Sequence, residues 1–155
     1  MSTGFGKKLI AFAAALVVAH VLGATAAAQH VINAFGAVAE PVGIAERIAW
    51  TLRDIKGMAL DGALPIYPVM VFAALLLGFA VVGMIVRRRD DLRVIGFCAA
   101  GFVGFVVAHL FLNWAGELHL VAATRTTLGL IAQGLAGAAG GYVYARLTRT
   151  AAWTG

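Results

Sequence analysis

Cysteine is almost absent from this sequence, with Cys98 as the only one among 155 residues. A chain with one cysteine forms neither an intrachain disulfide nor a cysteine-based zinc cluster. Cys98 itself falls inside an apolar run, where we interpret it as a small buried apolar side chain. Chemistry that needs a pair of thiols is therefore excluded.

Charged residues are also scarce, at 12% of the chain, whereas hydrophobic residues make up 62%. Soluble domains carry about 25% charged residues. A helix that crosses a bilayer needs about 20 mainly apolar residues. Four runs come close to that length: residues 9–28, 66–86, 94–114 and 127–145. The sequence therefore predicts an all-α, polytopic integral membrane protein, in which four transmembrane helices form one four-helix bundle.

The formal net charge of +5 does not indicate nucleic-acid binding, because the basic residues are distributed around the predicted spans. Eight of the twelve fall on one side of the membrane: Lys7, Lys8, Arg87, Arg88, Arg89, Arg93, Arg146 and Arg149. The other side combines four basic with five acidic residues: Arg47, Arg53, Lys56 and Arg125 with Glu40, Glu46, Asp54, Asp61 and Glu117. Short loops rich in Lys and Arg stay in the cytoplasm. We therefore predict cytoplasmic termini, and the compact, Ala- and Gly-rich chain favours a bacterial inner membrane.

The first apolar run raises the question of a signal peptide. Ala26 and Ala28 satisfy the small-x-small pattern of a signal-peptidase site. The apolar run is longer than most signal cores and contains His20, so we expect an uncleaved span. In either case Gln29 emerges on the outer side of the membrane.

Residues 41–60 have the periodicity of an amphipathic helix. Apolar side chains recur on one face, and most charged side chains lie off it: the apolar stripe is Ile44, Ile48, Leu52, Ile55 and Ala59. Pro41 suits the first turn of a helix. We predict a helix that lies flat on the outer face of the membrane. It either caps the bundle at the headgroups, or docks a partner subunit or covers a cavity mouth.

Small residues form two ridges in the last two runs. They recur every fourth residue at Gly96, Ala100, Gly104 and Ala108, and again at Gly129, Gln133, Gly137 and Gly141. Such ridges let two helices touch backbone to backbone. We expect the third run to be the central helix, and the ridge of the fourth either to pack on the third or to mediate self-association. Aromatic residues near the outer boundary, Trp50, Tyr67 and Trp114, are expected to form an interfacial belt.

Polar side chains occur at a similar depth in three of the runs. Counted inward at 1.5 Å per residue, His20, His109 and Gln133 lie about 10 to 12 Å from the outer boundary. Asn113 follows His109 by one helical turn. Because a polar group facing lipid is costly, these side chains should point inward and bond to one another. The alternatives are a haem ligated by His20 and His109, a bound quinone or lipid headgroup, and a proton or small-molecule pathway.

The sequence does not favour an enzyme. The apolar runs contain no carboxylate, no nucleophile-base-acid arrangement and no phosphate-binding loop, and His30, Glu117 and His119 fit no established metal spacing. We predict a non-catalytic accessory subunit without a cofactor, which contacts the lipid bilayer. Its Gly- and Ala-rich helices pack into a homo-oligomer or with other membrane subunits. The alternatives are a small haem- or quinone-binding redox protein that uses His20 and His109, and an oligomeric channel.

Overall fold

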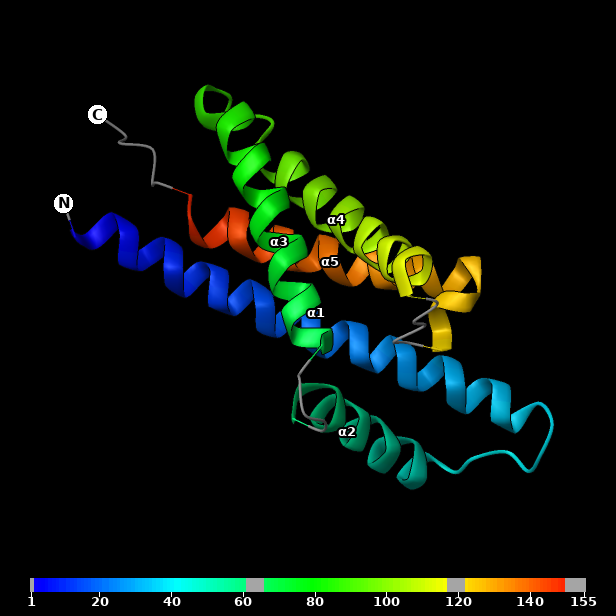
Figure 1. The fold of residues 1–155 in the computed structure, drawn as a ribbon. Helices are drawn as coiled ribbons and strands as arrows, with labels where there is room; N and C mark the ends of the chain where they lie inside the picture. The colour runs from blue at the N-terminus through cyan, green and yellow to red at the C-terminus, as the bar shows by residue number, and fades with distance from the viewer. Residues whose placement is uncertain (1, 61–65, 117–121, 150–155) are drawn as a thin grey trace.

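The computed structural model describes residues 2–60, 66–116 and 122–149. These residues form five α-helices: α1 Ser2–Gly36, α2 Ile44–Leu60, α3 Ile66–Ile85, α4 Arg93–Gly116 and α5 Thr127–Leu147. Short 3-10 helices follow α3 and precede α5: η1 Val86–Arg88 and η2 Ala122–Arg125. Figure 1 shows α1, α3, α4 and α5 packed as a bundle, with α2 beside the second half of α1. The all-helical prediction is confirmed.

Three helical segments are long and apolar enough to cross a membrane: Gly4–Gly36, Ile66–Ile85 and Arg93–Trp114. The protein therefore has the helix length and composition of an integral membrane protein. α5 has 21 residues, but its glycines and the amide of Gln133 make it less apolar than the other three helices. A fourth span at α5 stays a prediction.

α1 is much longer than the apolar run that predicts it. Its 35 residues continue past Gln29 to Gly36. Proline and glycine interrupt helices most strongly, and neither occurs between residues 24 and 35. The helix therefore continues until Gly36, beyond the point at which a hydropathy pattern would end it.

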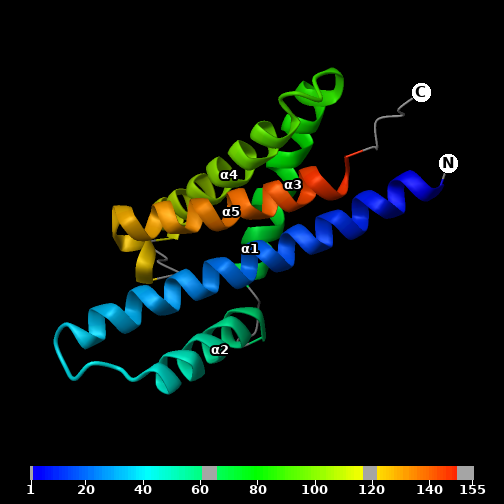
Figure 2. The ribbon, with the colours of Figure 1, turned by 180° about the vertical axis from the view of Figure 1, so that it is seen from behind.

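α2 runs antiparallel to the second half of α1 (Figures 1 and 2). Four side-chain hydrogen bonds join the two helices in this order: Arg47 to Asn33 at 2.9 Å, Arg47 to Gln29 at 3.1 Å, Gln29 to Thr51 at 2.8 Å, and His20 to the carbonyl of Ile55 at 3.1 Å. These bonds tie α2 lengthwise to α1. That α2 lies flat on the outer face of the membrane stays a prediction.

The apolar stripe of α2 does not cover the bundle. Ile44, Ile48 and Leu52 are exposed, Ile44 to 80%, and the helix contributes no buried residue. α2 also begins at Ile44 rather than at Pro41, and the backbone amide of Arg47 donates to the carbonyl of Gly43 in its first turn. α2 therefore contributes only partly buried side chains to the core, among them Met58.

α5 lies between α1 and α4 (Figures 1 and 2). Glycine permits both contacts: a Cβ on Gly137 would collide with the carbonyl oxygen of Gly101 in α4. On the opposite side, a Cβ on Gly140 would stand 2.9 Å from the carbonyl oxygen of Ala15 in α1. α5 is therefore a central helix of the bundle, with α4 on one side and α1 on the other.

The small-residue ridge of α4 lies against α3. A Cβ on Gly104 is 2.9 Å from the carbonyl oxygen of Ala74, and a Cβ on Gly78 would be 3.0 Å from that of Ala100. The glycine of α4 that meets α5 is Gly101, one position along from the ridge. The ridges of α4 and α5 thus serve two different interfaces.

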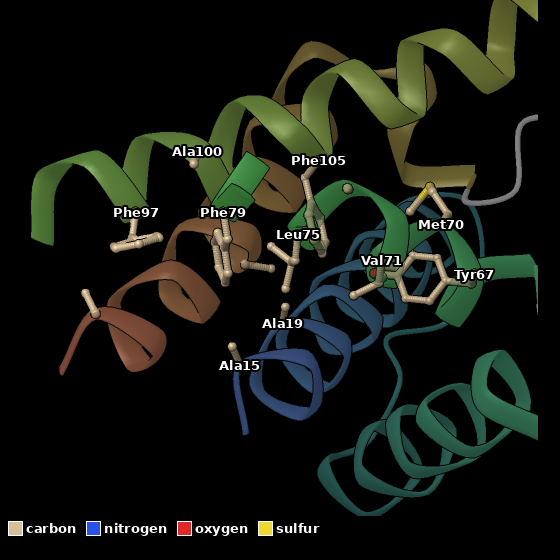
Figure 3. Close-up of a cluster of buried hydrophobic side chains, with 14 of the residues drawn as sticks. Ala15, Ala19, Tyr67, Met70, Val71, Leu75, Phe79, Phe97, Ala100 and Phe105 are labelled. Carbon is tan, nitrogen blue, oxygen red and sulfur yellow. The ribbon is translucent and has the colours of Figure 1, made fainter. Parts of the chain in front are cut away.

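The middle of the core is formed by one face of α3. Tyr67, Val71, Leu75 and Phe79 recur every fourth residue, and all four are buried. Figure 3 shows these side chains projecting from α3 into the space among α1, α4 and α5. This face holds α3 against the other three helices.

One end of the bundle is basic. Nζ of Lys7 in α1 donates to the carbonyl of Arg149 at 3.5 Å, and Nη2 of Arg93 in α4 donates to the carbonyl of Thr148 at 3.5 Å. The turn between α3 and α4 lies at the same end (Figure 1). The chain therefore brings the basic residues that surround these helix ends together in space.

The glycine contact between α4 and α5 predicts a large cost for a single methyl group. Gly137→Ala should destabilise the bundle by about 1 to 3 kcal/mol, because its Cβ would overlap the Gly101 carbonyl. Thermal unfolding of the purified protein in detergent should show a lowered midpoint. Gly6→Ala is the matched control, since a Cβ there meets nothing within 4 Å. Equal midpoints for the two variants would contradict the backbone contact.

Candidate functional site

A buried polar cluster joins the four bundle helices. At its centre is Gln133 of α5, which is 0% exposed. Its Oε1 accepts a hydrogen bond from the hydroxyl of Tyr67 in α3 at 3.0 Å, and its Nε2 donates to the carbonyl of Gly23 in α1 at 2.9 Å. His109 of α4, which is 1% exposed, lies beside them, with its ring centroid 6.3 Å from that of Tyr67. We call Tyr67, His109, Gln133 and the Gly23 carbonyl the polar cluster.

Glycine at position 23 makes this arrangement possible. A Cβ there would collide with the Tyr67 hydroxyl and would stand 2.9 Å from Oε1 of Gln133. The missing side chain leaves space for both groups beside the α1 backbone. Tyr67 reaches this position from the first turn of α3, where Pro68 is tolerated because the first amides of a helix have no intrahelical acceptor.

His20 lies beside the polar cluster and bonds elsewhere. Its Nε2 is 3.1 Å from the carbonyl oxygen of Ile55 in α2. The centroid of its ring is 5.4 Å from that of Tyr67, and the ring of His109 is 6.3 Å from that of Tyr67. His20, His109 and Gln133 thus lie near one another, as the sequence predicts, but only His109 and Gln133 belong to the polar cluster.

These distances do not fit a haem between the two histidines. Axial ligation would require a flat slot between the imidazoles of His20 and His109. The ring of Tyr67 packs against both imidazoles, and its hydroxyl is fixed to Gln133. The space that the macrocycle needs is therefore taken by a side chain.

Three buried polar atoms on α4 have no hydrogen-bond partner among the described residues. One is Nε of Arg93 at the start of the helix; the other two are Nε2 of His109 and Oδ1 of Asn113, one helical turn apart. A buried polar group left unpaired costs about 1 to 3 kcal/mol. Glu117 and His119 lie outside the described residues, and within the described part of the chain no three metal-ligating side chains come together.

Tyr67 is the residue that sequence reasoning misses. It belongs to the expected aromatic belt, yet its side chain is only 5% exposed and bonds to Gln133 in the core. The sequence does contain a pattern that indicates burial: Val71 and Leu75 follow Tyr67 at four-residue spacing on the same helix face. Both are buried in the structure. Tyr67 therefore begins the core-facing side of α3.

A groove of about 450 Å³ lies beside His20, between α1, α2 and α3. We call it the α1–α3 groove. His20 is its polar side chain, and the others are Leu16, Val17, Val21, Ala59, Pro68, Val69, Val71 and Phe72. The groove therefore presents one imidazole in an apolar surface.

A larger groove of about 780 Å³ follows the contact between α3 and α4, and we call it the α3–α4 groove. All of its lining side chains are apolar. Small residues include Ala73, Ala74, Gly78, Ala99, Ala100 and Gly104. Larger, exposed residues include Leu77, Val81, Val103, Val107 and Phe111. This face thus combines a recess with protruding side chains.

The hydrogen bonds of the polar cluster predict a difference between two amide-to-leucine substitutions. Gln133→Leu should lower stability by about 1 to 3 kcal/mol, because it leaves the buried Tyr67 hydroxyl unpaired and removes the bond from Gln133 to the Gly23 carbonyl. Asn113→Leu should cost less, since it removes an oxygen that has no described partner. Thermal unfolding in detergent compares them. An equal or greater loss for Asn113→Leu would be inconsistent with this cluster.

Comparison with known proteins yields no relative. No protein-family model, curated protein or solved structure matches the chain. No fold assignment or residue role is therefore carried over from another protein. The polar cluster, the two grooves and the basic end are the features on which a function rests.

Proposed function

We propose that this protein is a non-catalytic membrane subunit that assembles with a second copy of itself through the α3–α4 groove. The observation that carries the proposal is the groove itself. Its lining is wholly apolar, small residues let another helix approach closely, and the chain leaves it open. Helices in lipid associate chiefly through such close packing, because the bilayer supplies no hydrophobic drive between them.

The glycine ridge of α5 is not available for assembly. Gly137 contacts α4 and Gly140 contacts α1 within the same chain. Small residues remain accessible on the other side of the bundle, where Ala73 and Ala99 are exposed in the α3–α4 groove. This groove is therefore the small-residue surface that a partner helix can reach.

A second copy suits this surface because one face carries both recesses and protrusions. In a two-fold symmetric dimer the same patch meets itself, so it must be self-complementary. Leu77 protrudes from α3, and Val103 and Phe111 protrude from α4, each at least half exposed. A two-fold rotation sets these side chains of one copy against Ala73 and its small neighbours in the other.

The polar cluster supports a structural role rather than catalysis. Both polar groups of the Gln133 side chain are used in bonds that tie α5 to α1 and α3. The described residues of the four bundle helices include no aspartate or glutamate. A buried acid that could exchange protons with a substrate is therefore missing from this part of the chain.

In this proposal α5 is a fourth span of a bacterial inner-membrane protein. It lies between α1 and α4, both of which are long and apolar enough to cross the bilayer. The basic end, where Lys7 meets Arg149, faces the cytoplasm, because loops rich in Lys and Arg are retained there. The hairpin of α1 and α2 then lies at the outer side.

Filling the α3–α4 groove should weaken assembly. Ala73→Leu places a larger side chain in the groove, so the dimer fraction should fall. Ala13→Leu is the matched control, because Ala13 is equally an exposed alanine but lies on α1. Light scattering after size-exclusion chromatography in mild detergent gives the molar mass of each variant.

Three outcomes decide between the possible occupants. A dimer that Ala73→Leu dissociates and Ala13→Leu does not would support the proposal. A monomeric wild type would overturn self-association. A monomer that migrates in a larger complex in native membrane extracts, and loses that complex on Ala73→Leu, would assign the groove to another subunit.

The orientation is tested by cysteine labelling. In a Cys98→Ala background, Lys56→Cys on α2 and Lys8→Cys on α1 provide single exposed thiols. In cells with a permeabilised outer membrane, an impermeant maleimide should label Lys56→Cys at once and Lys8→Cys only after lysis. The reverse order would place the basic end outside.

A further inference from the structure

We propose that the α1–α3 groove binds a prenylated quinol, whose ring hydroxyl donates a hydrogen bond to Nδ1 of His20. This site shares only the wall residue Val69 with the α3–α4 groove, and it does not depend on assembly. It also differs from the arrangement expected from the sequence, because His109 takes no part. His20 alone supplies the polar contact.

The bond to α2 determines what His20 can offer. The carbonyl oxygen of Ile55 can only accept a hydrogen bond, so Nε2 of His20 must carry the proton. In a neutral imidazole, Nδ1 is then a bare acceptor. Nδ1 has no partner among the described residues, and it is not one of the buried unpartnered atoms. It is therefore not fully buried, and His20 lines the groove.

The rest of the lining selects for a neutral ligand. It contains no charged side chain, so a phosphate or carboxylate would be buried without a counter-charge. A neutral hydroxyl, by contrast, needs only one acceptor. The ligand must thus be an uncharged hydrogen-bond donor attached to an apolar body.

The position of the groove indicates that the ligand enters from the bilayer. Its outer walls include Val17 of α1 and Val69 and Phe72 of α3, all of which are exposed. These residues belong to two helices that are long and apolar enough to span a membrane. A ligand dissolved in lipid can therefore reach His20 sideways, with its tail along the same apolar surface.

The shape and lining favour a flat ring as the donor-bearing group. Phe72 and Pro68 provide flat apolar surfaces, and aromatic rings pack well against such faces. The volume of about 450 Å³ lies within the range of about 300 to 1,000 Å³ that is usual for small-molecule sites. It accommodates a quinol ring and the first part of its prenyl tail.

The experiment compares the two redox forms of one ligand on the full-length protein in detergent. The probes are a benzoquinol with a ten-carbon tail and the corresponding benzoquinone, with binding measured by calorimetry under anaerobic conditions. The quinone has no ring hydroxyl, so the wild type should bind it about tenfold more weakly than the quinol. Equal affinity for the two forms would overturn the proposed hydrogen bond.

Variants separate the acceptor from the groove. His20→Leu should reduce quinol affinity about tenfold and abolish the difference between quinol and quinone. His20→Gln should restore part of that difference, because an amide can donate to Ile55 and still accept from the ligand. His30→Leu, which replaces another α1 histidine outside the groove, should bind like the wild type.

Two further measurements test whether a variant has lost binding through misfolding and whether another neutral lipid occupies the groove. Val17→Trp fills the groove without removing His20, so it should abolish binding of both forms while the unfolding midpoint stays unchanged. Undiminished binding by this variant would place the ligand elsewhere. Dioleoylglycerol, a neutral lipid with a hydroxyl, should compete weakly; tighter binding than the quinol would make a neutral lipid the occupant and refute the proposal.

Discussion

The backbone contact between α4 and α5 sets the geometry on which the rest of the bundle depends. Gly101 and Gly137 let the two helices approach more closely than any side chain would permit. The opposite side of α5 reaches α1 through Gly140. In a bilayer, where apolar surfaces gain nothing by leaving lipid for protein, this contact and a few hydrogen bonds hold the helices together.

The polar cluster is a consequence of that close approach. Gln133 lies on the ridge of α5, so its amide extends to the Gly23 carbonyl only because α1 is drawn in beside it. Tyr67 then completes the arrangement from α3. The glycine contacts thus position the polar groups, and the hydrogen bonds then join those groups across the helices.

The sequence predicts where the helices of this bundle begin and end better than it predicts which helices pack against each other. Long apolar runs locate α3 and α4 closely, because hydropathy is a local property of about 20 residues. The partner of each glycine ridge, by contrast, is not a local property. A glycine ridge can pack against any helix backbone, so the sequence does not indicate that Gly104 meets α3 and Gly137 meets α4. The antiparallel pairing of α2 with α1 is not local either, because it depends on hydrogen bonds between the two helices.

The candidate site shows the same division. The burial of His109 and Gln133 follows from the cost of placing polar groups in lipid, which a sequence reveals. The role of Tyr67 does not follow, because a tyrosine near a span boundary is equally suited to the interface and to the core. His20 bonds to the Ile55 carbonyl of α2 instead of joining His109 and Gln133. Counting residues inward from the membrane boundary gives the depth of His20 but does not reveal this partner.

Because α2 contributes no buried residue, its attachment to the bundle affects the environment of His20. A helix with no buried residue detaches at a lower free energy than the helices of a packed core. Its detachment would remove the Ile55 carbonyl that fixes the imidazole tautomer and Ala59, which forms one wall of the groove. Local unfolding of this one helix would then change the tautomer of His20 and widen the groove, while the four-helix core stays closed.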